Sequence, residues 1–207
     1  MAPIHDAIRA GDVEAVRREL AAGVSPDLEE IIQWNNNNFT PLMVAAWNEQ
    51  PEITMLLIEA GADVNVINSG DFSPLLLACQ RGTEATIAAL IAAGASVSQR
   101  ISFHYGGMSS LPVERVSKNH KRVVSMLLRA GSPLPRHDYT CFMIDILSGF
   151  NAAATAYVNA VAAAGGYVPY ARAHRKKLAA IFTPKFPQLP EEVVPTIIEF
   201  WAHVGHY

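Results

Sequence analysis

The chain has 207 residues, of which 50% are hydrophobic and 17% charged, so it can bury a sizeable core and is not disordered by composition. Sixteen Lys and Arg against nineteen Asp and Glu give a net charge of −3, which does not favour a dedicated nucleic-acid binder. Two cysteines in this length exclude a disulfide-stabilised scaffold and favour a reducing compartment. We therefore expect a cytoplasmic protein, with a nuclear location as the alternative.

A recurring pattern divides the first two thirds of the chain. A leucine-rich segment that ends in Ala-Gly occurs four times, and its closing glycines are spaced 38, 33 and 37 residues apart. These glycines are Gly23, Gly61, Gly94 and Gly131. A second marker, TPLMVAA from Thr40 and SPLLLAC from Ser73, repeats after the same 33 residues. Each unit is predicted to form a short helix, a tight turn and a longer helix that stops at the glycine.

Residues at the ends of these helices support the prediction. The hydroxyls of Thr40 and Ser73 are placed to cap the first helix of their units, and Pro41 and Pro74 occupy the first helical positions. The closing glycines can adopt the left-handed conformation that ends the second helix.

These markers resemble the ankyrin repeat over residues 4–135. The segment Thr40–Asn65 follows the family pattern almost position for position, and the third unit follows it well. The first unit lacks the TPL opening. The fourth is the weakest, because Arg115 replaces the small inward alanine of the other units, which is Ala7, Ala45 or Ala78.

The resemblance implies an all-α solenoid of about four repeats with short hairpin loops. The repeats would cover residues 4–37, 38–70, 71–107 and 108–135 of a domain at residues 1–135. Met43 and Leu76 occupy the place of the family's usual histidine, so we expect its side-chain hydrogen-bond network to be absent.

Two of the glycine spacings exceed 33 residues, by five and four, and the additions fit the loops at residues 31–39 and 100–108. Insertions on one face of a solenoid often mark its binding face. A tolerated loop extension is the alternative, since loop closure costs little extra with length. Four side chains on these loops are candidate contacts: Trp34, Phe103, His104 and Tyr105.

The resemblance also implies a concave groove lined by the first helices, with two variable positions of each helix pointing into it. Those pairs are Arg9/Ala10, Trp47/Asn48, Gln80/Arg81 and Ser117/Lys118. An exposed Trp47 would be a candidate hot spot, whereas the alternative is that it folds over its own repeat or packs on the neighbouring loop. The groove candidates for partner binding are Trp47, Asn48, Gln80, Arg81 and Lys118.

Charge is uneven along the chain. Residues 1–63 carry eleven acidic and three basic residues, whereas residues 100–136 carry seven basic and one acidic. Such a gradient can orient a polar partner, although runs of charge can also be ordinary solvated faces.

Residues 136–207 are predicted to form a C-terminal helical extension that caps the solenoid. Helices are expected at 138–150, at 151–166, after Pro169 and at 190–207. The window between Asp145 and Arg172 is uncharged and long enough to span a bilayer. Its alanines gain little in a membrane and its asparagines are costly there, so we expect a buried helical pair and no membrane insertion.

The sequence contains no dinucleotide fingerprint, phosphate-binding loop, nucleophile elbow or HExxH motif. His203 and His206 lack a third zinc ligand, and Cys79 and Cys141 are expected to be buried thiols. We therefore predict no catalytic residues, no cofactor and no metal site. The predicted function is binding of another protein by a monomeric scaffold through the groove and the extended loops.

Two alternatives remain open. The segment LPEEVVPTIIEFW resembles the opening of an F-box, and a helical tail after ankyrin repeats is similar to SOCS-box proteins. The tail, however, lacks the cysteine expected in an elongin-binding helix. The first alternative is thus a ubiquitin-ligase substrate adaptor whose C-terminal helices recruit a cullin-complex subunit. The second is an enzyme or ligand site between solenoid and tail.

Overall fold

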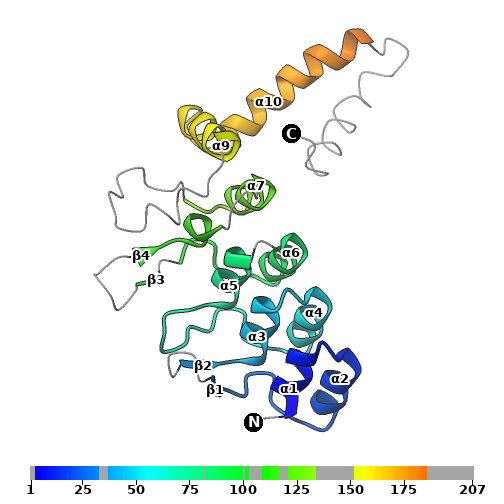
Figure 1. The fold of residues 1–207 in the computed structure, drawn as a ribbon. Coiled ribbons are helices and arrows are strands. Elements are labelled where there is room, and N and C mark those ends of the chain that lie inside the picture. Colours follow the sequence, from blue (N-terminus) through cyan, green and yellow to red (C-terminus); the bar gives the residue numbers. More distant parts are fainter. Residues whose placement is uncertain are drawn as a thin grey trace. The chain divides into compact units, whose positions relative to one another are not determined.

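The computed structural model describes residues 3–32, 37–81, 83–99, 101–102, 109–116, 121–133 and 152–185. The chain divides into two compact units, Met1–Asn151 and Ala152–Tyr207 (Figure 1). The predicted boundary between residues 135 and 136 lies outside the described residues and stays a prediction.

The first unit is a stack of helix pairs (Figure 1). The pairs are α1 (Pro3–Ala10) with α2 (Val13–Ala21), α3 (Pro41–Trp47) with α4 (Pro51–Glu59), and α5 (Pro74–Arg81) with α6 (Glu84–Ala92). The first helix of each pair contacts the first helix of the next pair, and the second helices contact one another in the same way. This arrangement confirms the predicted all-α solenoid, in which each repeat is stabilised mainly by its neighbours.

The fourth repeat departs from the predicted pair of helices. Its first element is a short 3₁₀ helix, η1 (Pro112–Arg115), which precedes α7 (Lys121–Arg129). Arg115 is half-buried at the place where the other repeats have a small inward alanine. A side chain of this size cannot enter the close contact between neighbouring first helices that alanine permits. The weak fourth match in the sequence thus corresponds to a shortened element.

Two small antiparallel hairpins lie on the same side of this stack (Figure 1). Strand β1 (Glu30–Ile32) pairs with β2 (Asn37–Phe39), and β3 (Ile101–Ser102) pairs with β4 (Ser109–Ser110). The additional residues therefore fall in hairpins between repeats, as the spacing predicted. The loop aromatics Trp34, Phe103, His104 and Tyr105 lie outside the described residues.

The predicted helix ends are confirmed. Thr40 Oγ1 accepts a hydrogen bond from the Met43 amide at 3.4 Å, and Ser73 Oγ accepts one from the Leu76 amide at 3.2 Å. The closing glycines have φ values between +87° and +95°, a conformation that costs glycine nothing but disfavours other residues. They are Gly23, Gly61, Gly94 and Gly131.

The core of the first unit runs along the first helices. In α3 every residue from Pro41 to Ala46 is buried, and in α5 every residue from Pro74 to Cys79. Cys79 takes the place of the second small alanine, and its thiol is fully buried. Short side chains at these positions let adjacent first helices approach closely. The expectation that Cys79 is a core thiol is confirmed, whereas Cys141 lies outside the described residues.

The described part of the second unit contains α9 (Ala152–Ala163), α10 (Tyr167–Phe182) and the 3₁₀ turn η2 (Thr183–Lys185). Helix α10 begins two residues before Pro169, so the prediction that it starts after this proline was wrong. Proline is tolerated in a first helical turn, because the missing N–H has no intrahelical partner there. The rings of Tyr157 and Tyr170 join the two helices edge to face, with centroids 5.5 Å apart.

Among the described residues, none of the helices has the length and apolar character needed to cross a membrane. The helices expected at residues 138–150 and 190–207 lie outside the described part of the chain.

Candidate protein-binding surface

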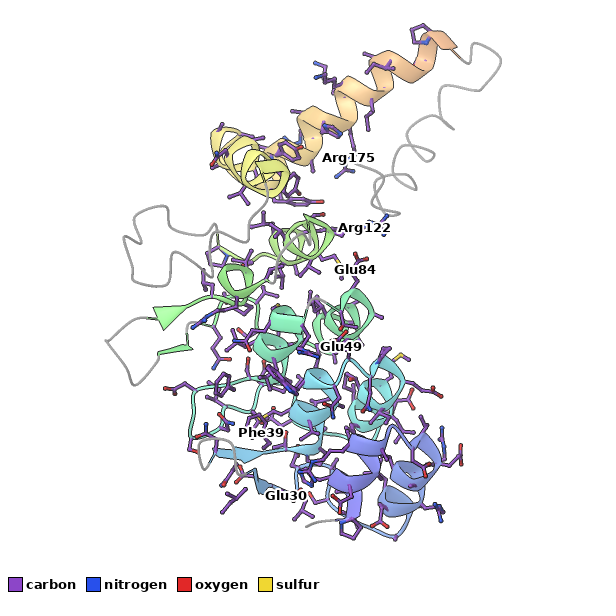
Figure 2. All side chains as sticks on the ribbon, in the orientation of Figure 1. Glu30, Phe39, Glu49, Glu84, Arg122 and Arg175 are labelled. Carbon is purple, nitrogen blue, oxygen red and sulfur yellow. The ribbon has the colours of Figure 1, made fainter. Side chains whose placement is uncertain are left out.

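The ends of α3 and α5 bring three side chains of consecutive repeats together. The guanidinium carbon of Arg81 lies 5.0 Å from the ring centroid of Trp47, within the range of a cation–π contact. Nη2 of the same arginine lies 2.9 Å from Oε1 of Glu49. Glu49, labelled in Figure 2, lies at the turn that follows α3. We refer to Trp47, Glu49 and Arg81 as the Trp47 cluster.

The side chains of the Trp47 cluster are partly exposed. The indole is half-buried, and an arginine of the next repeat lies over its ring. The side chains of Arg81 and Glu49 are 41% and 47% exposed. A mixed aromatic and charged surface of this kind is typical of protein contacts.

The other predicted contact residues are placed as follows. Asn48 is the half-buried C-cap of α3, and Gln80 is half-buried in the last turn of α5. Lys118 lies outside the described residues. The structure thus brings Trp47 and Arg81 together. That the nine predicted contact residues bind a partner remains a prediction.

Glu49 was missed by the sequence reasoning. Its φ is +59°, in the left-handed region, whereas the equivalent turn of the first repeat uses Gly11 at φ +71°. The equivalent residue 33 positions later is Gly82 in the sequence. A left-handed non-glycine residue costs about 1–2 kcal/mol, and an exposed ion pair returns only about 0.2–1 kcal/mol. Stability alone therefore does not account for a glutamate here. The sequence signal that could have identified Glu49 is that the equivalent turns of the neighbouring repeats have glycine.

A second charged cluster lies on the first repeat. Arg9 donates to Asp6 Oδ1 at 2.9 Å and to Glu30 Oε2 at 3.1 Å, so it joins α1 to the first hairpin. Arg9 was expected to face the groove. Its guanidinium is occupied by carboxylates of its own repeat and of β1, so this end of the surface remains acidic.

His5 was also missed. It is fully buried, its Nε2 lies 3.0 Å from the carbonyl oxygen of Phe39, and its Nδ1 lies 3.4 Å from Glu30 Oε2 (Figure 2 labels Glu30 and Phe39). Burial is the main cause that lowers the pKa of His5 below its usual value, although the hydrogen bond and Glu30 oppose it. The neutral ring therefore donates from Nε2 to the Phe39 carbonyl and ties α1 to β2.

This contact corrects the expectation that the histidine network is absent. Met43 and Leu76 do bury apolar side chains at that position in the second and third repeats. In the first repeat, however, His5 stands two residues before the inward Ala7, as Met43 stands before Ala45. This alignment in the sequence could have identified His5 as the histidine of the first repeat.

The loop between the second and third repeats is organised by Asn68. Its side-chain oxygen accepts from the amides of Gly70 and Phe72, and its Nδ2 donates to the carbonyl of Asn38 in β2. The rings of Phe39 and Phe72 stack with centroids 6.3 Å apart. These contacts fix the loop against the first hairpin, so the hairpin side of the surface is built from residues of adjacent repeats.

The chemistry available to catalysis or metal binding is limited in the described ranges. They contain no group of three or more His, Cys, Asp or Glu side chains that could hold a metal ion. Burial raises the pKa of the Cys79 thiol, so it stays protonated and is a poor nucleophile.

The stacked helix pairs, hairpins and left-handed glycine stops define a helical-repeat solenoid. Residues 1–68, which hold α1–α4 and the first hairpin, match the family model described as ankyrin repeats (3 copies). This part of the chain is therefore made of ankyrin repeats, and α5, α6 and α7 continue the same helical stack. No curated protein matches the chain. Ankyrin repeats generally mediate protein–protein interaction and are generally non-catalytic, and the C-terminal extension belongs to no assigned family.

Proposed function

We propose that this protein is a non-catalytic scaffold that binds another protein through its concave groove and hairpin loops. The observation that carries the proposal is the cation–π contact of Arg81 with Trp47 across two consecutive repeats. Tryptophan and arginine are the residue types most enriched in binding hot spots, and the contact holds both in place before any partner arrives.

The first hairpin, which precedes α3, adds exposed apolar side chains. Ile31 is 62% exposed on β1, and Leu28, just before the strand, is 40% exposed. Exposed apolar side chains on an extended hairpin support the idea that the hairpins take part in binding.

The test starts with the full chain, used in the native cell for proximity labelling to identify partners. Affinity for a recovered partner is then compared between the wild type and Trp47→Ala. We expect binding to weaken at least tenfold, because a hot-spot truncation costs about 2 kcal/mol or more. Met55→Ala is the control, since Met55 is 48% exposed but lies on a second helix.

Unchanged affinity for Trp47→Ala, with thermal melting also unchanged, would contradict a role for the groove. A cullin-complex subunit that is recovered with the full chain and lost from a 1–186 truncation would support the adaptor alternative instead. Circular dichroism of the truncated chain checks that the loss does not come from unfolding.

A further inference from the structure

The Trp47 cluster leaves much of its arginine available. The guanidinium carbon of Arg81 lies over the indole ring, and one terminal nitrogen is paired with Glu49. A guanidinium carries five N–H donors in a planar fork that matches a carboxylate. Because the side chain is 41% exposed, donors on the remaining edge can reach a group from outside.

The two neighbours of Arg81 restrict its movement. The indole of Trp47 lies against the guanidinium on one side, and the ion pair with Glu49 holds one of its terminal nitrogens. Glu49 does so from a left-handed backbone position that the first repeat gives to glycine. Residues held in such strained conformations are concentrated at binding and catalytic sites. A carboxylate there holds Arg81 in one orientation.

The surrounding charge selects the sign of the incoming group. Arg81 lies between the acidic residues 1–63, with eleven acids and three bases, and the basic residues 100–136, with seven bases and one acid. A positively charged group would compete with Arg81 for Glu49 and would face the arginine itself. A negatively charged group is instead attracted to the exposed edge of Arg81.

We propose that Arg81 is the specificity-determining residue of the groove and receives a carboxylate side chain, Asp or Glu, of the protein partner. Trp47 and Glu49 are positioning residues that present its free edge. This inference rests on the proposed function, since it concerns the chemistry of the same surface.

The experiment is a peptide-display selection against the full chain, which needs no knowledge of the natural partner. Peptides retained by the wild type and released by Trp47→Ala are the groove-binding set. We expect an Asp or Glu at a fixed position in this set. Replacing that acid by its amide in a synthetic peptide should weaken binding at least tenfold for the wild type and less than threefold for Arg81→Gln.

Two further variants separate recognition from structure. Arg81→Lys keeps the charge but not the fork, so it should lose most of the preference for the acid over the amide. Glu49→Gln should reduce the same preference ratio while thermal melting stays near that of the wild type. A purely structural role of Glu49 would change affinity for both peptides equally and leave the ratio unmoved.

The outcomes distinguish the two proposals. If no peptide set depends on Trp47, the groove proposal itself fails. If a Trp47-dependent set appears but carries no fixed acid, or carries Lys or Arg there, the groove stands and the assignment of Arg81 is overturned. Retention of the acid preference in Arg81→Gln would overturn it as well.

Discussion

At the scale of single residues, the most informative position is Glu49, at a turn where the first repeat has glycine. Glu49 adopts φ +59° between α3 and α4 and pairs with Arg81 of the next repeat. Its cost and its ion pair can be separated by comparing two substitutions that both remove the carboxylate.

We expect Glu49→Gly to be more stable than Glu49→Ala by about 1 kcal/mol. Both variants lose the ion pair, but only alanine keeps a Cβ in the left-handed region. Urea denaturation of the two variants measures the difference. Equal stabilities would mean that the backbone at this turn relaxes and that no strain is held there.

His5 gives a prediction with a definite sign. Its folded pKa is lowered, mainly by burial, below the usual value of 6.5, so the unfolded chain binds the proton more readily. The stability that it contributes is present above about pH 6.5 and is lost as the pH falls from there toward the folded pKa.

The matched control is His5→Met, which places at this position the residue found in the second repeat. Between pH 7.5 and 5.5 the unfolding free energy of the wild type should fall more steeply than that of His5→Met. The difference removes the contributions of the other six histidines, since the chain has seven in all. Parallel pH profiles would show that His5 is not kept neutral in the fold.

At the scale of elements, the helix ends offer a matched pair. Ser73 Oγ accepts from the Leu76 amide at the start of α5, whereas Thr83 precedes α6 without a side-chain cap hydrogen bond. We expect Ser73→Ala to lower stability by about 1 kcal/mol and Thr83→Ala to lower it by clearly less. Thermal melts of both variants test this, and equal losses would argue against the capping role of Ser73.

Most elements of the first three repeats could be predicted from the sequence, because their signals are local. Capping hydroxyls, prolines at the first helical position and closing glycines each act within a few residues. The fourth repeat shows the limit. Arg115 marked it as atypical, but whether its first element would form an α-helix depends on packing against α5, which the local pattern does not contain.

The candidate site was only partly predictable for the same reason. Trp47 and Arg81 were named separately from their groove positions, but their contact depends on the offset between neighbouring repeats. The contacts of Glu49 with Arg81 and of His5 with Phe39 span 32 and 34 residues along the chain. Side-chain partners at such distances are fixed by tertiary packing rather than by local propensity.

At the scale of the whole molecule, stability is distributed unevenly along the stack of repeats. Each repeat of the first unit contacts mainly its neighbours, so its stability is a sum of local contributions and interfaces. The α5 helix lies between α3 and η1 and buries six residues, whereas the equivalent helix of the first repeat, α1, buries three. Opening of the stack is therefore easier at its N-terminal end than in the third repeat.

The labelling rate of the buried Cys79 thiol measures how often the third repeat opens. In a Cys141→Ser background, a thiol reagent can reach the sulfur of Cys79 only while the third repeat is open. We expect labelling to be slower than for a free thiol by at least about a thousandfold, equivalent to an opening free energy of about 4 kcal/mol. Labelling at the free-thiol rate would contradict the packing around α5. If a bound partner slows the labelling of Cys79 further, its stabilising effect extends to the third repeat.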